Sequence, residues 1–96
     1  MFYIKYDMTE TEYLHCIRDI CSRHNAEMVL LFGSRAKKTN RPNSDFDIAV
    51  FGIDDISSVV NEIDELPALF SADVVNMNKC GNKNLIKDIM SYGIQI

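Results

Sequence analysis

The sequence has no tryptophan, only two prolines and four glycines among its 96 residues, and no long apolar run. A helix that crosses a bilayer needs about 20 predominantly apolar residues, so we expect no membrane-spanning segment. The N-terminus also lacks the basic start, the apolar stretch and the small-residue cleavage site of a secretory signal. These absences lead us to expect a cytoplasmic protein.

Cysteine is scarce as well. Cys16, Cys21 and Cys80 make an odd number in a chain without an export signal, so we expect reduced thiols rather than a disulfide framework. Cys21 and His24 stand three residues apart, with His15 nearby, which is a spacing that two zinc ligands on one helix can have. No Cys-x-x-Cys pair is present, so the pattern does not favour zinc.

An excess of positive charge is also missing, because the formal net charge is -4. Broad binding to nucleic-acid backbones needs a cationic surface, so we expect no direct nucleic-acid binding. The basic residues are nevertheless concentrated, since Arg35, Lys37, Lys38 and Arg41 lie within one short segment. This segment is either a solvated loop or a local anion site.

What is present is the composition of an ordinary globular protein, with 47% apolar and 25% charged residues. The length suffices for one modest core, so we expect a single domain over residues 1–96. The apolar pattern predicts six elements. These are helices over 10–24, 56–66 and 83–92, and strands over 28–32, 45–51 and 72–76. This mixed order predicts an α/β (α+β) fold.

Two local signals mark helix ends. Thr9 and Glu12 have the spacing of a capping box at the start of the first helix. Gly93 stands where a left-handed cap would end the last helix. Residues 2–6 are compatible with an edge strand or with a loose arm.

Two aspartates, Asp45 and Asp47, open the second predicted strand. Side chains alternate between the faces of a strand, so these two project from one side with Cα atoms about 6.5 Å apart, while Phe46 points to the core. Two carboxylates at this spacing are either solvated or bind a cation. Donors that are all oxygen favour Mg²⁺ or Mn²⁺ over zinc.

The first predicted strand runs directly into Gly33 and Ser34. Gly33 permits a sharp turn that exposes backbone N–H groups, and Ser34 adds a hydroxyl at the predicted start of a short helix. Such a turn can bind phosphate. It is not a Walker A loop, because no Gly-Lys-Ser/Thr follows. The alternative is a strand-to-helix turn capped by serine.

Asp73 interrupts the apolar third strand, where a buried carboxylate without a partner would be costly. If this strand lies beside the one that holds Asp45 and Asp47, three carboxylates converge. Such a cluster can hold two divalent ions. The alternative is an edge-strand aspartate that faces water.

Taken together, these residues resemble the signature of the DNA polymerase beta-like nucleotidyltransferase superfamily. Gly33-Ser34 is followed after ten residues by Asp45-Phe46-Asp47, and then by Asp73 on a later strand. The segments LFGSRA, SDFDIAV and ADVV are most similar to the minimal nucleotidyltransferases, the MNT antitoxin group. The resemblance implies a small nucleotidyltransferase core with a mixed β-sheet and helices packed on it.

One feature departs from that group, in which a glycine often follows the GSRA segment. Here Lys37-Lys38-Thr39-Asn40 follows. Asn40 is a residue type that tolerates the left-handed conformation, so we expect it to preserve the turn.

The resemblance also implies an activity, the transfer of AMP from ATP to a hydroxyl group with release of pyrophosphate. Gly33 and Ser34 would hold the phosphates of the nucleotide, with Arg35 as a further phosphate contact. Two Mg²⁺ ions would be bound by the acidic residues Asp45, Asp47 and Asp73. Asp73 would also help to deprotonate the acceptor hydroxyl.

The partner, too, is implied by the resemblance. Larger members of the superfamily carry an acceptor-binding domain for which 96 residues leave no room, so we expect another molecule to present the acceptor. In the MNT group this is a HEPN-domain toxin, which the antitoxin binds and adenylylates on a tyrosine. The assembly is then a homo- or hetero-oligomer.

Two other functions stay open. One is a small-molecule nucleotidyltransferase of the aminoglycoside-resistance kind, and the other is a non-catalytic binding subunit. A phosphatase of the haloacid dehalogenase type also uses an Asp-x-Asp pair. It is disfavoured because Ile48 and Ala49 replace the small residue and the threonine expected after Asp47.

Overall fold

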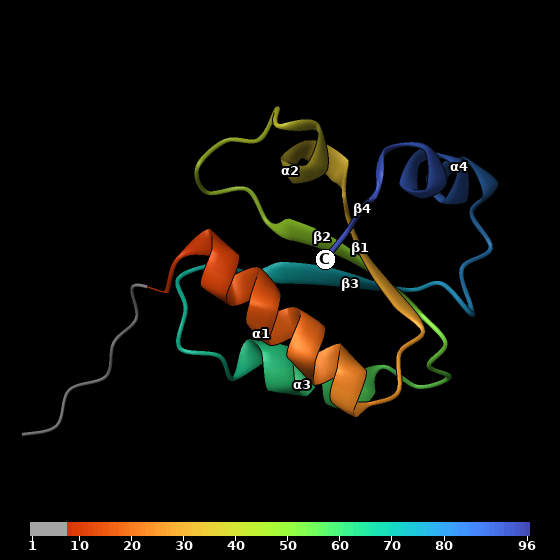
Figure 1. The fold of residues 1–96 in the computed structure, drawn as a ribbon. Coiled ribbons are helices and arrows are strands. Elements are labelled where there is room, and N and C mark those ends of the chain that lie inside the picture. The colour runs from red at the N-terminus through yellow and green to blue at the C-terminus, as the bar shows by residue number, and fades with distance from the viewer. Residues whose placement is uncertain (1–7) are drawn as a thin grey trace, which may run out of the picture.

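The computed structural model describes residues 8–96 (Figure 1). The elements are α1 (Glu10–Arg23), β1 (Met28–Phe32), α2 (Gly33–Lys37), β2 (Phe46–Phe51), α3 (Ser57–Asp64), β3 (Ala72–Asn76), α4 (Lys83–Tyr92) and β4 (Ile94–Gln95). The predicted order of helices and strands is confirmed, and β4 is an element that the pattern did not reveal. The question of a strand over residues 2–6 lies outside the described residues.

The four strands form one mixed sheet in the order β3-β2-β1-β4. β1 is antiparallel to β2 and to β4, whereas β2 and β3 are parallel. The mixed sheet is therefore confirmed. Because β2 and β3 run in the same direction, the starts of these two strands lie side by side.

Helices cover both faces of the sheet, with α1 and α3 on one face and α2 and α4 on the other (Figure 1). The side chains of β2 alternate between these layers. Phe46, Ile48 and Val50 belong to the core under α1 and α3. Ala49 packs with Ile89 of α4 in a second apolar cluster. Asp47 therefore projects toward the face that α2 and α4 cover.

The capping box at the start of α1 is confirmed. The Thr9 hydroxyl accepts a hydrogen bond from the Glu12 N–H at 3.1 Å, and the Glu12 carboxylate accepts one from the Thr9 N–H at 3.2 Å. A cap of this kind stabilises a helix by about 1 kcal/mol. None of the helices within residues 8–96 is both long and apolar enough to cross a membrane.

α3 spans Ser57–Asp64, so it begins one residue after the predicted start at Ile56 and ends two residues before the predicted end at Leu66. The Asp55 carboxylate accepts a hydrogen bond from the Ser57 N–H at 2.9 Å. This local bond holds the residues before Ser57 in a turn, so the helix begins after them.

The left-handed cap predicted at Gly93 is wrong. Gly93 has a φ of -63° and an extended backbone, because the chain continues directly into β4, where Ile94 pairs with Leu31. Glycine is needed here for another reason. A Cβ atom at this position would overlap the carbonyl oxygen of Ile89.

Candidate functional site

The chain turns sharply at Gly33, between β1 and α2. Its φ of 71° lies in the left-handed region that favours glycine. The preceding Phe32 pairs with Asp47 across the sheet, so the turn passes against the Asp47 side chain. A Cβ atom at position 33 would overlap the Asp47 carboxylate. The backbone conformation and the close approach of Asp47 both require glycine.

α2 begins at this turn without a side-chain cap. The first N–H groups of a helix have no acceptor within the helix. The Ser34 carbonyl accepts a hydrogen bond from the Thr39 N–H at 2.9 Å, but the Ser34 hydroxyl has no hydrogen-bond partner among residues 8–96. The start of α2 therefore offers hydrogen-bond donors next to Asp47.

Asp47 and Asp73 occupy the same register position on the parallel strands β2 and β3. Neighbouring strands lie about 4.8 Å apart, so the two side chains leave the sheet close together and on the same face. Asp47 is half-buried and Asp73 is exposed. The adjacency of the two strands, on which the predicted meeting of carboxylates depends, is thus present.

Asp45 completes the acidic group from a position just before β2, which begins at Phe46 rather than at the predicted Asp45. Burial raises the pKa of Asp47, and the negative charges of Asp73 and Asp45 raise this pKa further. The three carboxylates therefore interact electrostatically, and a cation between them would relieve the repulsion.

The carboxylates are not arranged as a ready-made metal site. Among residues 8–96 no group of three or more His, Cys, Asp or Glu side chains has the geometry to hold a metal ion. The chemistry of the donors does fit a hard cation, since Asp45, Asp47 and Asp73 supply oxygen ligands only.

Arg35 lies away from the place expected for a phosphate contact. Its side chain is 3% exposed, and its guanidinium carbon stands 3.9 Å from the centre of the Phe46 ring. Phe46 points to the opposite face of β2 from Asp47. The guanidinium therefore lies on the Phe46 face of β2, on the far side of the strand from Asp47.

The hydrogen bonds of Arg35 instead hold the loop before β2. The guanidinium donates to the Ser44 carbonyl at 2.6 and 2.9 Å and to the Pro42 carbonyl at 3.2 Å. It also pairs with the Glu10 carboxylate of α1 at 2.7 Å. Ser44 directly precedes Asp45, so Arg35 positions one of the carboxylates. Glu10 is 25 residues away in sequence, and no local pattern signals the pair.

The turn after α2 is preserved by a residue other than the predicted Asn40. Lys38 takes the left-handed conformation, with a φ of 58°, and its N–H donates to the Arg35 carbonyl at 3.4 Å. Further along the loop, the Ser44 hydroxyl accepts a hydrogen bond from the Arg41 N–H at 3.0 Å. Ser44 thus shapes the loop.

A small hollow lies beside Asp45. It has a volume of about 200 Å³ and is lined by Arg35 and the loop residues from Pro42 to Asp45, together with Leu69, Phe70 and Ser71. The loop that Arg35 holds is therefore one wall of an open space next to the acidic group.

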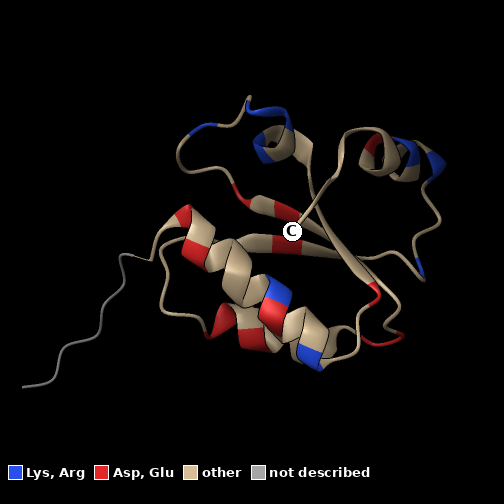
Figure 2. Ribbon diagram, in the orientation of Figure 1, with Lys and Arg blue, Asp and Glu red and all other residues tan. Residues whose placement is uncertain are grey.

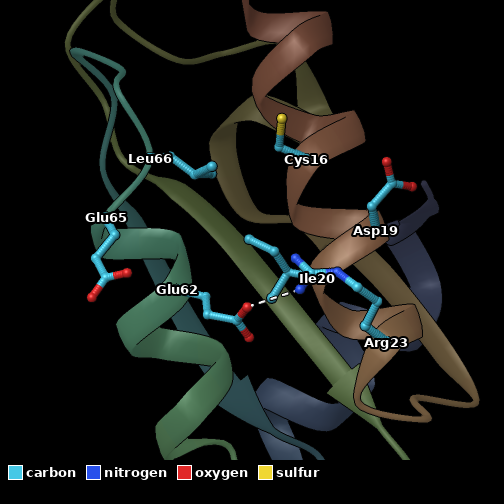
Figure 3. A pocket seen from close by; sticks show the side chains of 7 residues that line it. All are labelled: Cys16, Asp19, Ile20, Arg23, Glu62, Glu65 and Leu66. Carbon is cyan, nitrogen blue, oxygen red and sulfur yellow. Dashed lines mark hydrogen bonds and ion pairs between the residues drawn. The ribbon is translucent and has the colours of Figure 1, made fainter.

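A larger pocket, of about 450 Å³, lies elsewhere, between α1 and α3. Figure 3 shows that Arg23 and Glu62 face each other across it, and they form an ion pair at 3.0 Å. Glu62 also bonds His24. Burial raises the pKa of the neighbouring Cys21 thiol to about 11, which keeps that thiol protonated. None of the predicted site residues lines this pocket.

A comparison with protein families supports the interpretation of the motif. The profile of the family described as "Polymerase beta, Nucleotidyltransferase" matches residues 15–96. Among curated protein sequences, none matches the chain significantly.

Several solved structures share the fold. A toxin–antitoxin with AMP-PNP superposes with a TM-score of 0.69 and 23% identity, over 84% of this chain and 69% of the other. An aspartate-to-glutamate double mutant of the toxin–antitoxin MntA-HpeT has a TM-score of 0.64 and 22% identity, over 91% and 71% of the two chains. A tyrosine-to-alanine mutant of MntA-HpeT also has a TM-score of 0.64 and 22% identity, over 94% of this chain and 72% of the other.

Proposed function

The chain belongs to the polymerase beta nucleotidyltransferase family, and from that membership we propose that it transfers AMP from ATP to a hydroxyl group of a partner protein. The observation that carries the proposal is the pairing of Asp47 with Asp73 at one register position, against the turn at Gly33. It supports a site in which acidic groups and phosphate-binding donors lie next to each other.

The acidic group is the part of the site that would hold magnesium. Asp45, Asp47 and Asp73 are the ligands we propose, for two ions by resemblance to the family. Burial raises the pKa of Asp47, and the charges of Asp73 and Asp45 raise it further. A bound cation would remove this repulsion between the carboxylates, which supports the assignment. When bound, the metal would neutralise charge on the phosphates and on the departing pyrophosphate.

The Gly33–Ser34 turn is where we place the phosphates of ATP, held by backbone N–H groups and by the Ser34 hydroxyl. The acceptor oxygen forms a bond to the α-phosphorus, while the bond from that phosphorus to the bridging oxygen breaks. Pyrophosphate leaves with the electron pair of the broken bond. The proton of the acceptor hydroxyl passes to Asp73, whose carboxylate is exposed at the sheet edge.

The partner we propose is a HEPN-type toxin, for which this chain is the antitoxin and a tyrosine hydroxyl is the acceptor. The structural neighbours support this choice. One is a toxin–antitoxin with the ATP analogue AMP-PNP, and two are MntA-HpeT complexes. One of these carries aspartate substitutions two residues apart, the spacing of Asp45 and Asp47, and the other carries a tyrosine substitution.

The test is to incubate the full chain with ATP and Mg²⁺, alone and with the protein encoded by the adjacent reading frame. Intact-mass spectrometry is expected to show that partner heavier by one or more AMP groups. Asp45→Asn combined with Asp47→Asn removes the metal charge at nearly constant shape and is expected to reduce transfer at least about a hundredfold.

Other results of this test would identify the alternatives. Transfer to an aminoglycoside but to no protein would indicate a small-molecule enzyme. Tight association with the partner, with no transfer under any condition, would indicate a non-catalytic binding subunit.

A further inference from the structure

The charged residues of this chain are segregated between its two halves. Segments 33–44 and 77–93, which contain α2, its loop and α4, carry seven Lys or Arg residues and one acidic residue, a balance of +6. The rest of residues 8–96 carries two basic and twelve acidic residues, a balance of -10. Figure 2 shows this division, with blue concentrated on α2, its loop and α4, and red on α1, α3 and the ends of the strands.

Exposed apolar side chains also occur on α4 and β4. Met90 and Tyr92 at the end of α4 are 59% and 58% exposed, and Ile94 in β4 is 46% exposed. On α4, Lys83, Lys87 and Met90 follow one another at intervals of four and three residues, which places them on one side of the helix. We call the surface formed by these three residues the α4 face.

The two lysines of the α4 face have no partner within the described part of the chain. Neither the Lys83 nor the Lys87 ammonium group forms a hydrogen bond or an ion pair with another residue between 8 and 96. The opposite side of α4 is occupied, since Ile89 is fully buried against the sheet. The α4 face is therefore a mixed cationic and apolar surface without a described partner.

We propose that the α4 face docks a protein partner whose contact surface is acidic, with apolar side chains between its carboxylates. Cations mixed with exposed apolar side chains suit such a protein surface, by complementarity of both charge and apolar contact. A single-stranded nucleic acid would instead require free aromatic rings on which bases stack. The Tyr92 ring is the exposed aromatic here, and the Lys37 ammonium covers it at 4.7 Å.

Docking on the α4 face brings the partner close to the candidate active site. Lys37 of α2 forms an ion pair with Asp88 of α4 at 3.0 Å, so α4 is joined to the short helix that begins at Gly33. One part of this inference rests on the proposed function, namely that the docked partner is the protein that carries the acceptor hydroxyl. The docking itself requires neither nucleotide nor transfer.

The experiment measures binding of a fluorescently labelled Glu–Tyr copolymer to the full chain by anisotropy, at low salt and without nucleotide. The test variant combines Lys83→Glu and Lys87→Glu. The control variant combines Arg18→Glu and Arg23→Glu on α1, which changes the net charge by the same amount on the acidic half. The milder Lys83→Gln with Lys87→Gln is measured as well, and thermal unfolding verifies that each variant is folded.

The double lysine-to-glutamate variant of α4 is expected to weaken copolymer binding about tenfold, and the double lysine-to-glutamine variant less. The arginine-to-glutamate control on α1 is expected to change the Kd less than about twofold. Met90→Asp should also weaken binding, whereas Met90→Leu should retain it. Equal losses in the α4 and α1 variants, or no binding by the unmodified chain, would overturn the proposal. Tighter binding of an oligouridylate, lost in the same α4 variants, would show a nucleic-acid surface instead and also overturn it.

A failure of this inference is distinguishable from a failure of the proposed function. Asp45→Asn with Asp47→Asn is expected to leave copolymer binding unchanged, because neither aspartate belongs to the α4 face. Transfer of AMP to the partner without any effect of the α4 variants on binding would leave the enzyme assignment in place and remove only the docking surface.

Discussion

Asp47 stands beside Asp73 at the same register position of two parallel strands, and both carboxylates leave the sheet on the face that α2 and α4 cover. Burial raises the pKa of Asp47, and the like charges of Asp73 and Asp45 raise it further. The fold tolerates this repulsion at the start of β2 and β3. Such a local conflict is typical of a functional site.

Replacement of Asp47 by Asn is expected to stabilise the metal-free protein at neutral pH by about 1 kcal/mol or less. Because the pKa of this carboxyl is raised in the folded state, its contribution to stability is present below the unfolded pKa and is lost as pH rises through the folded pKa. At neutral pH the wild type therefore carries the full repulsion, which Asn removes.

The measurement for Asp47→Asn is thermal unfolding with a chelator over a range of pH. The gain in Tm should be largest near neutral pH and should disappear in acid, where Asp47 is protonated in the wild type. Asp54→Asn, an equal change of charge at an exposed position outside the site, is the control. A lower Tm of Asp47→Asn at neutral pH would contradict the repulsion argument.

Magnesium is expected to raise the Tm of the wild type and to leave the Tm of the Asp45→Asn, Asp47→Asn variant nearly unchanged. A ligand at a hundred times its Kd stabilises the folded state by about 2.7 kcal/mol. The shift should reverse when EDTA is added. Sodium chloride at equal ionic strength is the control, and an equal Mg²⁺ effect on both proteins would argue against metal binding at these aspartates.

Gly33→Ala is expected to destabilise the protein by about 1–3 kcal/mol. The added Cβ atom meets the Asp47 carboxylate, and the φ of 71° is unfavourable for alanine. Gly81→Ala is the matched control, because a Cβ at Gly81 has no neighbour within 4 Å. Chemical denaturation of both variants is the measurement, and equal stabilities would show that the turn relaxes without strain.

Arg35→Met is expected to destabilise the protein by about 2–4 kcal/mol, since it removes the donors to the Ser44 and Pro42 carbonyls. Glu10→Gln should cost less than about 1 kcal/mol, because the Glu10 side chain is 59% exposed. A double-mutant cycle measured by denaturation separates the two contributions.

The same Arg35 variants distinguish a loop clamp from a phosphate contact. A clamp predicts that Arg35→Met weakens Mg²⁺ binding through displacement of Asp45, with stability and metal affinity falling together. Unchanged stability combined with weaker binding of ATP alone would restore the role that the motif suggested for Arg35.

Local patterns were sufficient where short-range interactions decide the structure. The capping box of Thr9 and Glu12 placed the start of α1, and the apolar runs placed β1 and β3. The same reasoning was wrong at Gly93, where the chain continues into a strand. The alternation of apolar and polar residues could not reveal β4, because a strand of two residues is too short to show an alternating pattern.

The candidate site could be predicted only in part. The placement of Asp45 close to Asp47 follows from their spacing in the sequence, whereas Gly33 is brought against Asp47 by the pairing of β1 with β2. Lys38, rather than Asn40, takes the left-handed conformation after α2. The residue preference at such a turn is weaker than the hydrogen bonds that end the helix.

The sequence alone determined the order of the elements, the spacing of the glycine turn from the acidic pair, and the family to which they point. These features depend on neighbours along the chain. Only the tertiary structure decided that Asp73 stands beside Asp47, that Arg35 is buried under the loop, and that cations gather on α2 and α4. Each of these depends on contacts between residues distant in sequence. Such contacts are selected by the order of the strands and by the packing of the whole fold, which local sequence patterns do not contain.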